Sequence, residues 1–120
     1  MEDETTAIGA ASAAADAWLE RLDADDVEGS WEGTSSLFRR LVGQAQWRES
    51  VDKVRSIFGR TLHRELGDTR HTTTVPGAPD GEYVILEYAA GLERKQEAVE
   101  TVVAMRDDDG SWRVGGYFVR

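Results

Sequence analysis

The sequence has no cysteine, and histidine, proline and methionine each occur only twice among its 120 residues. The absence of cysteine excludes disulfides, thiolate metal sites and cysteine nucleophiles. The two histidines, His63 and His71, lie in Arg- and Thr-rich segments without the further ligands that a metal site requires. Phosphate-loop and dinucleotide-binding glycine motifs are also absent. We therefore expect neither a metal nor another cofactor.

Long apolar runs are missing as well, and the N-terminal segment is acidic where a signal peptide would be basic. This pattern is typical neither of a secretory leader nor of a membrane-spanning helix. We expect no insertion into a membrane, and the cytoplasm is the default expectation for the location of the protein.

Basic residues are outnumbered, with 14 Lys and Arg against 23 Asp and Glu, which makes the net charge −9. Such a surface repels nucleic-acid backbones and anionic lipids, so we expect no nucleic-acid partner. An apolar fraction of 40% and a charged fraction of 31% are typical of a folded domain. The length predicts a single domain over residues 1–120, in which residues 1–5 are disordered.

Apolar residues recur at spacings of three and four through the first half of the chain, as they do on one face of a helix. Gly59 stands where a glycine commonly ends a helix. Large aromatic side chains, Trp18, Trp31 and Trp47, mark the apolar faces. The pattern predicts three helices, over residues 6–22, 27–41 and 44–58.

After Gly59 apolar and polar residues alternate, as in strands. Asp107 to Gly110 form a hairpin turn signal and lack the ligand spacing of a calcium loop. The paired Gly115 and Gly116 indicate a bulge or a close backbone approach. The expected fold class is α+β, with three N-terminal helices packed on a curved four-stranded antiparallel sheet. The predicted strands cover residues 62–75 (one bulged strand or two short ones), 82–92, 97–106 and 111–120.

Several short sequence motifs follow one another along the chain, and their combination in this order is more specific for a family than any one of them. They include Ser36-Leu37-Phe38, Gln46-Trp47, VPGAPDGEYVILEY from Val75 and DGSWRVGGYFVR from Asp109. On these motifs the chain, from about Ala14 onward, resembles the uncharacterised bacterial family called domain of unknown function 4019. The resemblance implies no catalytic residues, because that family has no established activity, and it makes export to the periplasm the alternative location. The layout is also similar to the cystatin-like and nuclear-transport-factor-2-like (NTF2-like) cone folds, which host enzymes and binding modules alike.

The predicted strand over residues 82–92 carries apolar side chains on both faces, whereas a sheet covered on one side normally has one polar face. We expect its second face to curve around a pocket or to be covered by a partner. Glu87 and Glu100 are candidates to line such a pocket. The ordinary alternative is that they form ion pairs across strands with Arg106 or Arg113. The candidate ligand-binding residues are Tyr83, Glu87, Tyr88, Glu100, Trp112 and Arg113.

Three functions are compatible with these observations. The first is a non-enzymatic binding module whose concave sheet face, or the space between sheet and helices, takes a small ligand or a protein partner, including a second copy through the sheet. The second is an acid–base enzyme, which requires Glu87 or Glu100 buried and unpaired beside Tyr83 or Tyr88. The third is an accessory domain of a bacterial envelope complex.

Overall fold

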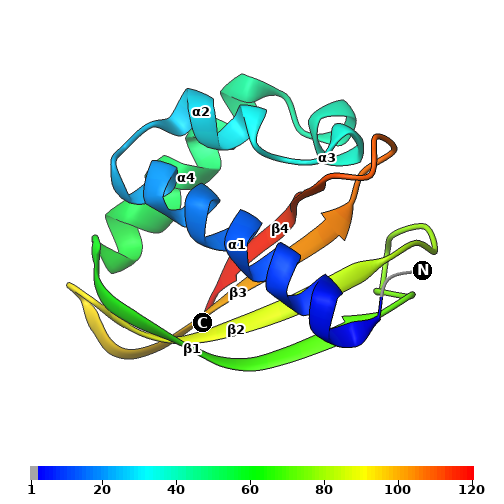
Figure 1. The fold of residues 1–120 in the computed structure, drawn as a ribbon. Coiled ribbons are helices and arrows are strands. Elements are labelled where there is room, and N and C mark those ends of the chain that lie inside the picture. The colour runs from blue at the N-terminus through cyan, green and yellow to red at the C-terminus, as the bar shows by residue number, and fades with distance from the viewer. Residues whose placement is uncertain (1–2) are drawn as a thin grey trace.

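The computed structural model describes residues 3–120 as four helices followed by four strands (Figure 1). The sheet is antiparallel with the order β1-β2-β3-β4, and it curves so that the helices lie on its concave side (Figure 1). The predicted α+β class is thus confirmed. The elements are α1 (Glu4–Asp23), α2 (Val27–Glu32), α3 (Ser36–Leu41), α4 (Gln44–Phe58), β1 (Thr61–Thr72), β2 (Tyr83–Leu92), β3 (Lys95–Arg106) and β4 (Trp112–Val119).

Helix α1 starts earlier than its apolar periodicity predicts, because Asp3 caps it. The Asp3 carboxylate accepts a hydrogen bond from the Thr6 backbone N–H at 2.9 Å, which satisfies a donor that the first turn leaves free. Of the segment 1–5 that was expected to be disordered, residues 3–5 form this cap and first turn, and residues 1 and 2 lie outside the described residues. The buried face of α1 repeats at helical spacing and consists of Ala7, Ala11, Ala15, Trp18, Leu19 and Leu22.

The prediction of one helix over residues 27–41 is wrong, since the chain leaves the helix between α2 and α3. There the backbone N–H of Ser35 donates to the carbonyl of Val114 at 2.8 Å, and Thr34 forms a parallel bridge with the same residue of β4. The Ser35 hydroxyl then caps α3 by accepting from the Phe38 N–H at 3.1 Å. Val114 lies 79 positions after Ser35 in the sequence (114 minus 35). This long-range contact interrupts the helix although the helical spacing of apolar residues continues.

Two tryptophans and a serine form the centre of the helical layer. The Trp18 indole N–H donates to the Ser30 carbonyl at 2.7 Å, and the Trp47 indole N–H donates to the Ser30 hydroxyl at 2.9 Å. The two indole rings lie 5.9 Å apart, and Trp18 also packs against Tyr117 of β4 at 5.4 Å. Both tryptophans are thus buried with their polar atoms satisfied, as large aromatic core residues require.

The strands follow the predicted pattern, with differences at the turns. β1 is one bulged strand, with a register shift between Leu66 and Thr69. Residues 93–94 are enough to connect β2 to β3, although a turn of four residues was predicted. Side chains alternate between two faces, and the concave face contributes Val84, Leu86, Val102, Ala104 and Val114 to the core under the helices.

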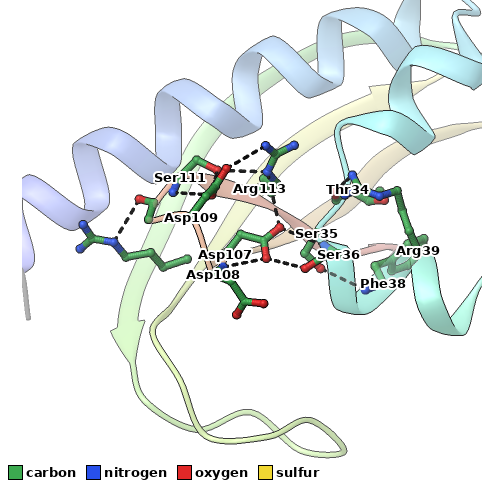
Figure 2. A network of polar contacts seen from close by, with 12 residues as sticks. Thr34, Ser35, Ser36, Phe38, Arg39, Asp107, Asp108, Asp109, Ser111 and Arg113 are labelled. Carbon is green, nitrogen blue, oxygen red and sulfur yellow. Dashed lines mark hydrogen bonds and ion pairs between the residues drawn. The ribbon is translucent and has the colours of Figure 1, made fainter.

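Helix α3 is tied to the β3–β4 turn by a carboxylate (Figure 2). Asp107 accepts from the backbone N–H of Ser36 at 2.9 Å and from the Ser36 hydroxyl at 2.6 Å. Burial raises the pKa of Asp107, but the hydrogen bonds from Ser36 and from the Asp108 N–H outweigh it, so the pKa lies below its usual value. The turn thereby holds the first residue of α3 against the edge of the sheet.

This tether predicts a pH-dependent loss of stability for Asp107→Asn. We expect the substitution to lower the free energy of unfolding by roughly 1–3 kcal/mol at pH 7, because the partly buried N–H and hydroxyl of Ser36 lose their charged acceptor. Since the folded state lowers the pKa, the difference from wild type is present above about pH 4 and disappears as the pH falls through the folded-state pKa. Urea unfolding of both proteins between pH 2 and pH 7 measures it.

The matched control is Asp108→Asn, since that neighbouring side chain is exposed. A difference between Asp107→Asn and wild type that stayed constant across the whole pH range would contradict the assigned role of the carboxylate.

Candidate functional site

The space between the helices and the concave face of the sheet is filled. The cavity there, beside Trp47 and Tyr117, has a volume of about 40 Å³. That volume admits water and is far below the roughly 300–1,000 Å³ of small-molecule sites. The concave face was the expected position of a ligand, but the cavity that the described residues leave beside Trp47 and Tyr117 is too small for one.

A larger hollow lies on the opposite, convex face of the sheet. Its volume is about 510 Å³, which falls in the range of small-molecule sites. Its floor consists of side chains that alternate with the core residues along β2, β3 and β4. These floor residues are Tyr83, Ile85, Thr101, Val103, Met105 and Phe118.

One wall of the hollow is α3, which lies along the β4 edge of the sheet. Leu37 and Leu41 line the hollow, and so does Phe38, whose ring also packs edge-on against Trp47 at 5.6 Å. The indole N–H of Trp31 donates to the Val42 carbonyl at 2.9 Å and so holds the end of this helix. The contact of Phe38 with Trp47 and the hydrogen bonds of Ser36 with Asp107 therefore hold this wall in position.

The second wall is the β1–β2 loop, defined here as residues 73–82. Val75 to Pro79 line the hollow. The loop is closed at its base by a hydrogen bond from the Gly81 N–H to the Thr73 carbonyl at 3.0 Å, and the Tyr83 hydroxyl donates to the Pro79 carbonyl. Tyr83 is thus buried outside the main core, under the loop.

The paired glycines of β4 give the floor its shape. The register of β3 and β4 shifts between Val103 and Ala104, which is the bulge that the sequence indicated. A Cβ atom at Gly115 would lie 3.0 Å from the sulfur of Met105, and one at Gly116 would lie 3.3 Å from the ring of Phe118. The absence of side chains at these two positions lets Met105 and Phe118 lie close over the strand.

Glu100 occupies the concave face and is completely buried. Its carboxylate accepts from Arg64 Nε at 2.8 Å, from the Tyr117 hydroxyl and from Thr61 Oγ1 at 3.3 Å. Arg64 also pairs with Asp23 at 2.6 Å. Burial alone would lower the pKa of Arg64, but these two carboxylates raise it, and burial followed by the charge of Glu100 raises the pKa of Tyr117.

Glu87 and Tyr88 lie apart from the hollow on opposite faces of β2. Glu87 is on the convex face, where Arg120 lies 3.2 Å away in a partly exposed ion pair. Tyr88 is on the concave face and donates to Asp16 at 3.1 Å, and burial followed by the Asp16 charge raises its pKa. The predicted pairing of Glu87 or Glu100 with Arg106 or Arg113 is wrong, because the strand register brings Arg120 and Arg64 to them instead.

An acid–base enzyme requires a carboxylate that is buried and unpaired, and neither glutamate meets this requirement. Glu100 is buried with an arginine, and Glu87 is paired near the surface. Both carboxylates thus have arginine partners, and the cavity that Thr61 and Tyr117 border near Glu100 has a volume of only about 40 Å³.

Trp112 and Arg113 lie at the start of β4, next to α1. Both border a shallow depression of about 310 Å³ together with Trp18 and Arg21. Arg113 donates to Ser111 Oγ at 3.0 Å and pairs with Asp109 at 3.3 Å (Figure 2). Hydrogen bonds from Ser111, with a smaller contribution from Arg113, lower the pKa of Asp109 to about 2. Arg113 therefore stabilises the β3–β4 turn through Ser111 and Asp109.

Of the six candidate residues, only Tyr83 lines the convex hollow. Reasoning from the sequence missed Met105, Phe118 and the residues of α3. The apolar second face of the 82–92 segment was the signal that pointed to this side of the sheet. Within residues 3–120 no group of three or more His, Cys, Asp or Glu side chains is placed to hold a metal ion, and His71 lies 3.6 Å from Glu82 instead.

A comparison with known protein families found a match. The chain matches the family described as "Protein of unknown function (DUF4019)" over residues 14–117. It belongs to that family. No curated protein and no solved structure matches it. In the described part of this DUF4019 protein, no helix is long and apolar enough to cross a membrane.

Substitution of the two candidate glutamates is expected to change stability by very different amounts. We expect Glu100→Gln to lower the free energy of unfolding by about 3 kcal/mol, since the substitution leaves Arg64 with an incomplete partner in the core. Glu87→Gln should change it by less than about 1 kcal/mol, because its ion pair is partly exposed. Urea denaturation followed by tryptophan fluorescence measures both variants. Equal effects would contradict the structural role assigned to Glu100.

Proposed function

We propose that this protein is a non-enzymatic binding module whose site is the hollow on the convex face of the sheet, and that its ligand is a small apolar molecule. The observation that carries the proposal is the composition of that hollow. In the described part of the chain its lining is mainly aliphatic and aromatic, without Asp, Glu, Lys, Arg or His. A site of this kind binds by removing apolar surface from water.

The exposure of two apolar side chains that line the hollow supports the same proposal. Phe118 is 62% exposed and Leu41 is 72% exposed, and they lie on the floor and the helical wall of one hollow. Contiguous exposed apolar surface is typical of interaction sites, whereas single exposed apolar residues are ordinary. The hollow is enclosed by two walls from different segments, so a compact molecule can be covered on more than one side.

A charged substitution on the floor tests the proposal with the neutral fluorescent dye Nile red as the probe. We expect Nile red to bind wild type and Val103→Glu to weaken that binding at least about ten-fold, because an apolar ligand would have to desolvate the new carboxylate. Fluorescence titration measures the affinity. Val99→Glu is the matched control, since it changes the same residue type on the same strand and face outside the hollow.

Light scattering on the same proteins separates a small ligand from a second copy of the chain. The proposal expects wild type and Val103→Glu to have the same molecular mass. A wild-type dimer that Val103→Glu dissociates, together with absence of Nile red binding, would contradict the small-ligand proposal. Equal Nile red affinity in all three proteins would contradict the assigned position of the site.

A further inference from the structure

Among residues 3–120, no charged side chain lines the hollow, so we place a charged group of its ligand at the mouth. Tyr83 is the ionisable side chain among its lining residues, and its hydroxyl is already bonded to the Pro79 carbonyl. The charges around the mouth therefore decide which head group an otherwise apolar ligand can carry.

Arg70 is placed at this mouth by the register of the sheet. It is the antiparallel partner of Ile85, a floor residue, and side chains of directly opposite residues project from the same face about 5 Å apart at their Cβ atoms. Arg70 is exposed, and among residues 3–120 it has neither a hydrogen bond nor an ion pair. An unpaired guanidinium beside an apolar surface is well suited to a carboxylate, which it can bind through two parallel hydrogen bonds.

Most other arginines of this acidic chain already have partners. Arg55, Arg60, Arg64, Arg106, Arg113 and Arg120 pair with carboxylates, and Arg21, Arg39 and Arg94 donate to backbone carbonyls. Besides Arg70, Arg40 and Arg48 have no such partner in the described residues. Arg48 lies on α4, away from the hollow, and Arg40 lies on α3 three positions after Leu37.

The carboxylates near the mouth favour the Arg70 end for an anion. Asp68 and Glu87 border a neighbouring depression on the convex face near Arg70, and Arg120 compensates the charge of Glu87 at 3.2 Å. Asp80, in the β1–β2 loop, acts on the Tyr83 end, where its charge adds to burial in raising the pKa of the phenol. A negative head group is therefore repelled at the loop end and attracted beside Ile85.

We propose that the ligand is an amphipathic monocarboxylate, with its aliphatic chain in the convex hollow and its carboxylate on Arg70. This inference rests on the proposed function, and it adds the head group and the residue that selects it. Arg70 acts as the specificity-determining residue, because it distinguishes a carboxylate from an uncharged or cationic head on the same chain.

Calorimetric titration with decanoate and with 1-decanol at pH 7.5 tests the inference on the full chain. We expect decanoate to bind wild type about five-fold more tightly than 1-decanol, and Arg70→Gln to abolish that preference while leaving the affinity for 1-decanol unchanged. Raising the salt concentration should reduce the preference in wild type, since the head-group contact is exposed. Arg48→Gln is the matched control, an unpaired exposed arginine elsewhere, and should behave as wild type.

The outcomes separate the two proposals. Failure of both compounds to bind would overturn the proposed function. Equal affinities for decanoate and 1-decanol, or a decanoate affinity unaffected by Arg70→Gln, would overturn only the carboxylate assignment. Loss of the preference in Arg40→Gln with Arg70→Gln unaffected would place the head group on the α3 wall and likewise overturn the role of Arg70.

Discussion

An antiparallel sheet has two faces, and the described helices of this chain cover one of them. Trp18, Trp47 and the alanine face of α1 pack against the concave side, and the cavity left beside Trp47 and Tyr117 has a volume of only about 40 Å³. The convex side of β2, β3 and β4 nevertheless keeps aliphatic and aromatic side chains. Apolar surface that the fold itself leaves partly uncovered is the physical basis of the proposed site.

The buried polar groups of the concave side connect the strands and α1 to one another. Glu100 of β3 accepts hydrogen bonds from side chains of β1 and β4, and Arg64 connects it to Asp23 at the end of α1. A carboxylate without exposure is tolerated only when its charge is matched and its oxygens are hydrogen-bonded, and both conditions hold here. Glu100 is therefore a fully paired carboxylate, whereas the acid–base enzyme considered above requires an unpaired one.

The convex hollow is assembled from segments that are distant in sequence. Its walls are α3 and the β1–β2 loop, and each is positioned by a few polar contacts: Asp107 with Ser36, Ser35 with Val114, and Tyr83 with Pro79. These contacts lie at the edge of the sheet and in turns, and the floor side chains of the hollow are outside the main core cluster. Stability and the proposed binding are therefore carried largely by different sides of the molecule, and convex-face substitutions can test binding with the core intact.

Local chemistry was enough to predict much of the fold. Helical spacing defined α4 to the residue, and alternation with turn signals located the strands, because both depend on neighbours within one turn or one hairpin. The apolar second face of β2 was likewise visible in the sequence. What only the tertiary structure decided is which face the helices cover and which residues meet. The split of α2 from α3 depends on Val114, the partner of Glu100 depends on strand register, and the placement of Arg70 beside Ile85 depends on a bulge in β1. The spacing of apolar residues determines which side chains share a face of a helix or strand. Pairing between distant segments determines which residues of other elements lie opposite that face.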